Sequence, residues 1–390
     1  MHSPRRSRLR VAFAALVATV PLSSLMFSPA GATDTTTTLG STATTSTTLA
    51  PTNVNVVGYS IVGPAFKALE AAFQATPSGK NVSFTNSFGA SDTVTTSVVN
   101  GQPADLVNLS YEPNMATLVT AGKVPSNWAG QELAYAHVNV AAKGAKQQTT
   151  YLTPGILTDS VVVFLVRKGN PRGISKWSDL IRSGSQVVTP NPLTSGSAKW
   201  NLLAGYASQL SLGHNAKQAQ NYLKSLIGHT VAQPTSGSAS LAAFVAGTGN
   251  VLLAYEDDAQ AAIAAGDQVQ IVTPPQTLLI ENPVALTTTG VHNPGAVAFY
   301  RYLFSAAGQG IFASLGYRSV LKNVWASTQN NFPVFKKATN LLSVANINKH
   351  GWPSVDPQFF GTEVAFPKGD NAHPSSGIVT YLEKFAGSNS

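Results

Sequence analysis

The amino-acid sequence predicts an α/β protein built from two lobes, each a mainly parallel sheet flanked by helices. Short apolar runs alternate with amphipathic segments from residue 54 to residue 110. The alternation resumes from 160 to 256, and further strand and helix signals follow to 316. With 390 residues, of which 43% are hydrophobic and only 11% charged, the chain is typical of a folded protein of two or three domains.

The first run of elements has the order strand, helix, strand, helix, strand. Strands are predicted at 54–61, 81–88 and 104–110, and helices at 63–75 and 91–101. Pro64 suits the first turn of the first helix, and Gly101 suits the end of the second. This order favours parallel strands with helices on both faces.

The second run begins with a strongly apolar strand at 160–169. Helices follow at 174–184, 197–210, 216–228 and 238–249. Strands are predicted at 185–192 and 250–256, with a short extended segment at 230–234. Extended segments at 269–275 and 280–288 and a helix at 293–316 are expected to complete the first lobe and the connection between the lobes. Residues 317–390 are richer in Pro, Asn and Gly than the segments before them.

The N-terminal region is predicted to lie outside the folded part. Residues 1–32 combine four arginines, an apolar stretch and small residues at the end, which is the pattern of a secretory signal peptide, and residues 33–52 are a Thr-rich disordered linker. We expect an exported protein of the periplasm or cell envelope; a leader retained as a membrane anchor is the alternative. The chain has no cysteine, so it is not lipid-anchored through one and forms no disulfide.

Charge gives little support for binding to nucleic acid. Removal of the leader takes away four of the 25 basic residues and leaves 25 − 4 = 21 against 17 acidic residues. No Lys/Arg-rich run remains, so we expect no nucleic-acid partner. No cofactor is implied, and we expect a monomer.

Three small, hydroxyl-rich turns recur before predicted helices. The peptide T-S-G-S-A occurs at 194–198 and at 235–239, and the related G-A-S-D-T occurs at 89–93. A helix N-terminus exposes amides without intrahelical partners and carries about half a positive charge, so three such turns can bind an anion without a lysine. The alternative is that these residues are ordinary helix caps.

The sequence resembles the sulfate-binding proteins of bacterial ABC importers from about Asn55 to Phe385. The most specific matches are VVVFLVRKGNPRGISKWSDLI at 161–181 and TPNPLTSGSAKWNLLAGY at 189–206. This resemblance implies a two-lobed clamshell of the type II periplasmic-binding-protein fold, with hinge strands between the lobes. It also implies a receptor that captures sulfate in the cleft between the lobes and delivers it to a membrane ABC permease.

The domain boundaries follow from this resemblance together with the element order. Lobe I is expected to contain residues 53–140 and, with the hinge, 271–345. Lobe II is expected to contain residues 141–270. A C-terminal segment, 346–390, is expected to pack over the lobes.

The resemblance also implies a set of ligand-binding residues, with no metal and no catalytic group among them. Ser91, Ser195, Gly196, Ser197 and Gly237 match the family's serine and glycine donors. Three further positions depart from the family pattern. Asp92 stands where the family has a glycine, Ser60 where it has an aspartate, and Tyr255 where it has a tryptophan. These departures leave the identity of the ligand open.

Several alternatives follow from the same residues. Thiosulfate, phosphate and molybdate are other tetrahedral oxyanions that such a site can take. Asp92 either points to solvent at a helix N-terminus or accepts the proton of a hydrogen phosphate ligand, and Lys199 is expected on a solvated helix face. A serine-type hydrolase is a remote alternative, because neither a G-x-S-x-G motif nor an S-x-x-K motif is formed by these turns, and we therefore expect no enzymatic activity.

Overall fold

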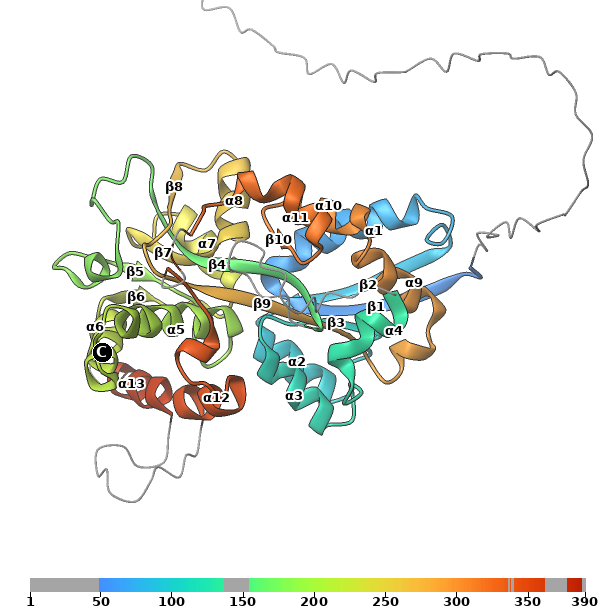
Figure 1. Cartoon of the computed structure of the whole chain (residues 1–390), viewed down its shortest axis with the longest axis horizontal. Coiled ribbons are helices and arrows are strands. Elements are labelled where there is room, and N and C mark those ends of the chain that lie inside the picture. Colours follow the sequence, from blue (N-terminus) through green and yellow to red (C-terminus); the bar gives the residue numbers. More distant parts are fainter. Residues whose placement is uncertain (1–48, 137–153, 336, 338–339, 362–376, 388–390) are drawn as a thin grey trace, which may run out of the picture. The chain divides into compact units, whose positions relative to one another are not determined.

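A computed structural model describes residues 49–136, 154–335, 337, 340–361 and 377–387, all within one compact unit, Ser46–Ser390 (Figure 1). The predicted signal peptide and most of the Thr-rich linker lie outside the described residues.

The first lobe contains three parallel strands, in the order β2-β1-β3, with β9 antiparallel to β3 at its edge. The bounds are β1 Thr52–Tyr59, β2 Val82–Gly89, β3 Leu106–Asn108 and β9 Thr277–Leu286. Successive side chains of β1 point to opposite faces of the sheet. Val54 and Val56 belong to the hydrophobic cluster that contains Phe66 and Phe299. Val57 belongs to the cluster that contains Val94.

Helices cover both faces of this sheet. They are α1 Gly63–Gln74, α2 Ser91–Val99, α3 Glu112–Thr120, α4 Gln131–Ala136, α9 Pro294–Leu303 and α10 Ala306–Ser314. The core residues of α1 and α9 belong to one face of the sheet, and those of α2 and α3 to the other (Figure 1).

The second lobe repeats this design. Strands β7 (Val251–Tyr255), β5 (Val187–Val188) and β6 (Thr230–Ala232) are parallel, and β4 (Ile156–Arg167) is antiparallel to β7 and to β8 (Val269–Val272). The helices of this lobe are α5 Gly196–Ser211, α6 Ala216–Gly228, α7 Gly237–Val245 and α8 Glu256–Ala264. The core residues of α5 and α6 pack on one face of β4 and those of α7 and α8 on the other.

Two long strands connect the sheets. The first half of β4 pairs with β9, and its second half pairs with β7 and β8. The end of β9 in turn pairs with β3 of the first lobe. Every residue of β4 except Arg167 is buried, and residues 161–166 in its second half form an unbroken apolar run, as expected for a strand covered on both faces. The predicted two-lobed α/β fold, with mainly parallel sheets joined by connecting strands, is therefore confirmed.

Two of the predicted helices are wrong in detail. The helix expected over 293–316 is two helices, because the Ser305 hydroxyl caps a new helix by accepting the Gly308 amide at 3.1 Å. The helix expected over 174–184 is only a 3₁₀ turn, Trp177–Ile181, whose start is capped by Asp179. The strand expected over 185–192 shrinks to β5 and ends two residues before Pro190.

The C-terminal region contributes short elements that pack on both lobes. They are β10 Arg318–Ser319, α11 Lys322–Thr328, β11 Leu341–Leu342, α12 Trp352–Phe360 and α13 Ile378–Gly387, and the remaining 3₁₀ turns are Ser60–Val62, Trp128–Gly130, Gly290–His292, Gln329–Asn331 and Val344–Asn346. The Trp352 ring lies 4.9 Å from that of Trp200 in α5 and 5.3 Å from that of Tyr111, which directly precedes α3. Helix α12 therefore contacts elements of both lobes.

Candidate anion-binding site

The three predicted turns lie together at the boundary between the lobes. Helix α2 of the first lobe and helices α5 and α7 of the second all begin there. The Asp92 amide donates to the Thr194 carbonyl at 3.1 Å, and the Thr194 hydroxyl donates to the Thr235 carbonyl at 2.9 Å. Because first-turn amides have no intrahelical partner, three partly positive helix ends meet at this place.

The serines of these turns play different roles. Ser236 is an ordinary cap, because its hydroxyl accepts the amide three residues further on at 3.2 Å. Ser195 stands at the corresponding position but makes no capping bond, and its Oγ lies 2.8 Å from the Ser197 Oγ. Ser91 Oγ accepts the Ser110 amide at 3.1 Å. The capping alternative therefore accounts for Ser236 but not for Ser195, Ser197 or Ser91.

Two glycines let the lobes approach each other. A Cβ atom at Gly196 would overlap the Ser110 hydroxyl and come within 2.8 Å of the Tyr111 ring, both at the end of β3 in the other lobe. A Cβ at Gly237 would lie 2.5 Å from the Ile61 side chain. Neither glycine has a positive φ. The requirement for glycine at both positions is therefore steric and arises between the lobes.

A small cavity lies beside these turns. Of the predicted residues, Ser197, Gly237 and Tyr255 line it, together with Asn201 and Asp258. The Tyr255 side chain is fully buried, and its hydroxyl lies next to the side chains of Asn282 and Ser110 without a hydrogen bond of normal geometry to any described residue. Burial raises the pKa of this phenol well above its ordinary value, so the hydroxyl stays neutral and can donate. A buried donor without a well-formed hydrogen bond in a cavity wall is available to a ligand or a water molecule.

Two residues of this region were not predicted. The Ser110 hydroxyl is buried beside the Tyr255 hydroxyl, makes no hydrogen bond of normal geometry within the described part of the chain and lies where a side chain at Gly196 would fall. Asn201 lines the cavity and donates to the Leu253 carbonyl at 2.9 Å, while its Oδ1 lacks a described partner. Ser110 follows the end of a strand, where open α/β sheets place ligands, and Asn201 follows Ser197 by one helical turn. Both signals were present in the sequence.

The expectations for Asp92 and Lys199 are corrected. The Lys199 ammonium is buried and lies 2.9 Å from Asp92 Oδ2, and it also bonds the Tyr111 hydroxyl. Asn114 donates to Asp92 Oδ1 at 2.9 Å. The reason is that the first turn of α5 faces α2, so Lys199 points at the opposite lobe and not at solvent. The Asp92 carboxylate is thus neither free in solvent nor unpartnered.

Ser60 lies at the opposite edge of the site. It opens the 3₁₀ turn after β1, and its hydroxyl accepts the Ser238 amide at 3.4 Å. This long hydrogen bond joins the first lobe to α7 of the second. Ser60 does not belong to the described wall of the small cavity.

Two α/β lobes that are connected by long strands and meet around a cavity with neutral donors define a solute-binding receptor. The chain belongs to the family of bacterial extracellular solute-binding proteins, whose sequence model matches residues 54–318.

Characterised relatives support this assignment. The chain is 30% identical over 325 residues to a sulfate-binding protein of Synechococcus elongatus, and the aligned region covers 82% of this chain and 86% of the relative. It is 32% identical over 321 residues to a sulfate-binding protein of Escherichia coli K12, with coverages of 80% and 90%. A thiosulfate-binding protein of Pseudomonas aeruginosa is 28% identical over 288 residues, with coverages of 71% and 81%.

Solved structures agree with the fold. The sulfate-binding protein SubI from Mycobacterium tuberculosis is 41% identical, with a TM-score of 0.70 over 79% of this chain and 99% of that one. The periplasmic binding protein AfuA from Actinobacillus pleuropneumoniae shares the fold alone, at 16% identity and a TM-score of 0.55, covering 70% of this chain and 86% of that one. Among the described residues, no helix is both long and apolar enough to cross a membrane.

Proposed function

We propose that this protein captures sulfate between its lobes and delivers it to an ABC permease. The observation that carries the proposal is the meeting of three helix N-termini with the neighbouring buried hydroxyls of Tyr255 and Ser110 at one place between the lobes. The names of the relatives agree with this ligand. The proposed donors are the amides of Gly196, Ser197 and Gly237 and the neutral hydroxyls near them.

Donors without acceptors favour a fully ionised oxyanion. Sulfate has no proton at neutral pH, so each of its oxygens can accept. Hydrogen phosphate carries an O–H that would be buried without an acceptor, at a cost of about 1 to 3 kcal/mol, or roughly ten- to hundredfold in affinity. Asp92 does not remove this cost in our proposal, because its carboxylate is bonded to Lys199 and Asn114.

One observation favours hydrogen phosphate as a second candidate. Asn201 lines the cavity, and its buried Oδ1 has no partner among the described residues. The amide nitrogen of Asn201 donates to the Thr189 hydroxyl and to the Leu253 carbonyl, and these two bonds fix the orientation of the side chain. The oxygen is then available to accept a hydrogen bond from a protonated ligand. The choice between the two anions therefore depends on whether Asn201 Oδ1 reaches the ligand.

The remaining parts of the proposal concern the form of the protein. It is a monomeric receptor without catalytic activity, exported through the leader at 1–32 and free of a cysteine-linked lipid. Lobe I comprises 53–140 and 271–345, which agrees with the packing of α9 on β1 and of α10 on α1. Lobe II comprises 141–270, and the C-terminal segment 346–390 packs over the lobes; of these ranges, 141–153, 362–376 and 388–390 lie outside the described residues.

Calorimetric titration at pH 6.5 tests the ligand. The purified protein, dialysed free of sulfate, is titrated with sulfate, thiosulfate, phosphate and molybdate. We expect sulfate to bind at least tenfold more tightly than phosphate, and Gly196→Asp, which places a carboxylate among the donors, to abolish binding while the fold is retained. Tighter binding of phosphate would instead support the role of Asn201 as an acceptor, and no binding of any of the four anions would refute the proposal.

A further inference from the structure

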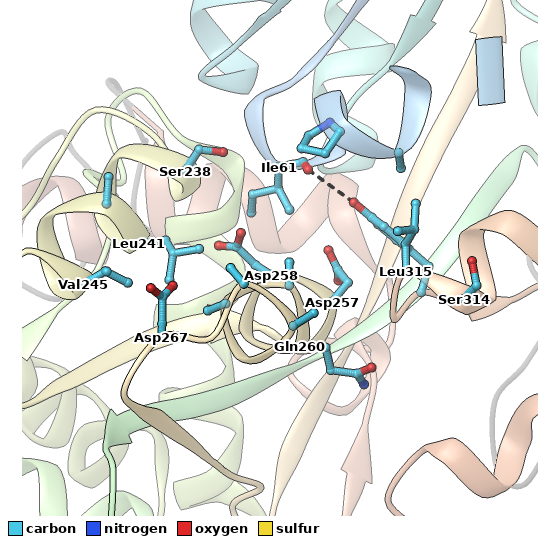
Figure 2. A pocket seen from close by; sticks show the side chains of 18 residues that line it. Ile61, Ser238, Leu241, Val245, Asp257, Asp258, Gln260, Asp267, Ser314 and Leu315 are labelled. Atoms are coloured by element: carbon cyan, nitrogen blue, oxygen red, sulfur yellow. Dashed lines mark hydrogen bonds between the residues drawn. The ribbon is translucent and has the colours of Figure 1, made fainter. Parts of the chain in front are cut away.

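Helix α8 places one acidic residue in the wall of the small cavity beside the proposed anion site. Asp258 lines the small cavity together with Ser197, Gly237 and Tyr255. It also lines a groove of ≈ 510 Å³ between α7, α8 and the start of α1. Figure 2 shows Asp258 in the wall of this groove, facing Ile61 and Ser238 of the surrounding elements.

The Asp258 carboxyl has no neutralising partner. The residue is 8% exposed, and no hydrogen bond or ion pair of its carboxyl is found with any other residue in the described part of the chain. The Arg318 guanidinium, which reaches the start of α8, is bonded to Glu256 at 2.7 Å. An ionised carboxylate here would be buried without compensation, which is unfavourable.

The other groups facing Asp258 are acidic or neutral. Asp257 adjoins it and accepts the Ser160 hydroxyl at 2.6 Å, and Asp267 lines the same groove. The phenols of Tyr255, from β7, and Tyr317, after α10, are both buried. On α7 and the turn after β1, the neighbouring polar groups are the uncharged Ser238 and Ser60. No element packed against Asp258 therefore offers it a positive charge.

This environment changes the protonation of Asp258. Burial, and to a lesser extent the neighbouring Asp257 carboxyl, raise the pKa of Asp258 to about 8. The helix N-terminus opposes this effect but does not reverse it. At neutral pH Asp258 is then a carboxylic acid with an O–H donor, like the other donors of the cavity.

We propose that Asp258 binds the captured oxyanion as a neutral acid, donating a hydrogen bond from its carboxyl group, so that the site is complete only when this residue carries its proton. The inference rests on the proposed function. Its geometric basis is the shared cavity wall with Tyr255 and Ser197 and the absence of any described partner for the carboxyl.

A pH dependence with a definite sign follows. A bound dianion favours the protonated acid, so the pKa of Asp258 is higher in the complex than in the free protein. Affinity is then constant while the free protein is protonated, and above the pKa of the free protein it falls by about tenfold per pH unit, with uptake of one proton per anion bound. Sulfate itself does not titrate in this range.

Calorimetry measures the sulfate affinity and the number of protons taken up on binding. The full protein is titrated with sulfate from pH 6 to pH 9.5, in pairs of buffers with different ionisation enthalpies. We expect constant affinity near pH 6, a tenfold loss per unit above about pH 8 and proton uptake approaching one. Asp258→Asn keeps the shape and a donor, so it should bind sulfate at pH 7 within a few-fold of the wild type and show no loss up to pH 9.5. Asp267→Asn, which alters the groove but not the cavity wall, should keep the wild-type profile.

The outcomes separate this inference from the proposed function. Binding at pH 6 with a flat profile and no proton uptake would overturn the role of Asp258 and leave the sulfate receptor intact. The role of Asp258 would also be overturned if Asp258→Asn showed the same loss of sulfate affinity with rising pH as the wild type. If the wild type prefers phosphate and Asp258→Asn loses that preference, Asp258 is an ionised acceptor and the inference is wrong. Absence of sulfate binding at pH 6 would overturn the proposed function itself.

Discussion

Replacing Gly196 by alanine tests whether closure of the lobes governs affinity. The backbone of Gly196 lies at the first position of α5 and has no positive φ, so alanine fits the local conformation. The added methyl would overlap the Ser110 hydroxyl and lie 2.8 Å from the Tyr111 ring. Both neighbours belong to the other lobe, so the clash exists only when the lobes are closed.

The magnitude follows from the cost of overpacking. One extra methyl in a well-packed contact costs about 1 to 3 kcal/mol. Because this cost falls on the closed, ligand-bound state, sulfate affinity should drop roughly ten- to hundredfold. The free protein should not be destabilised, since alanine favours a helix over glycine by about 0.5 to 1 kcal/mol.

Three measurements separate these effects. Calorimetry gives the affinity, thermal unfolding with and without sulfate gives the stability of each state, and small-angle scattering follows closure. Gly310→Ala is the matched control, because it lies in α10 with nothing within 4 Å of the new Cβ, and it should behave as wild type. Unchanged sulfate affinity and unchanged closure in Gly196→Ala would refute the steric reasoning.

The remaining predictions concern single side chains. Tyr255→Phe removes a buried donor that makes no hydrogen bond of normal geometry to a described residue, so calorimetry should show sulfate binding weakened by about 1 to 2 kcal/mol while the thermal stability of the free protein does not fall. Asp92→Asn leaves the buried Lys199 ammonium of the other lobe without its charge partner, so calorimetry should show weaker binding of sulfate and phosphate alike, with an unchanged ratio of the two affinities; unchanged sulfate affinity or a gain of phosphate selectivity would contradict this. Burial raises the pKa of Asp257 to about 7 and of Asp258 to about 8, so the stability that their protons provide is present at low pH and is lost as the pH rises through these values. Melting temperatures of the ligand-free protein should therefore fall between pH 5 and pH 9, and less steeply in Asp258→Asn.

Much of the fold was predictable because its signals are local. The apolar run that forms β4 and the strand and helix order of the first lobe come directly from side-chain periodicity. The break between α9 and α10 depends on a single serine cap within a continuous apolar pattern, and periodicity does not detect it. The exact length of β5 depends on where Pro190 falls in the sheet.

The candidate site was predictable only in part. Turns of serine and glycine before helices identified α2, α5 and α7, since the carboxyl ends of parallel strands meet at one edge. Contacts between residues far apart in the chain were not predictable. Lys199 and Asp92 each have a plausible solvent-exposed role when considered alone, and only the closed arrangement of the lobes shows that they pair. The same is true of Asp258, whose burial arises from both lobes.

A crystal structure of the protein with selenate, which scatters anomalously in place of sulfate, tests the central claim most directly. We predict one anomalous peak between the lobes, within hydrogen-bonding distance of the amides of Gly196, Ser197 and Gly237 and of the Tyr255 hydroxyl. A peak beside the Lys199 ammonium instead, or occupied crystals with no peak between the lobes, would contradict an anion site built from neutral donors.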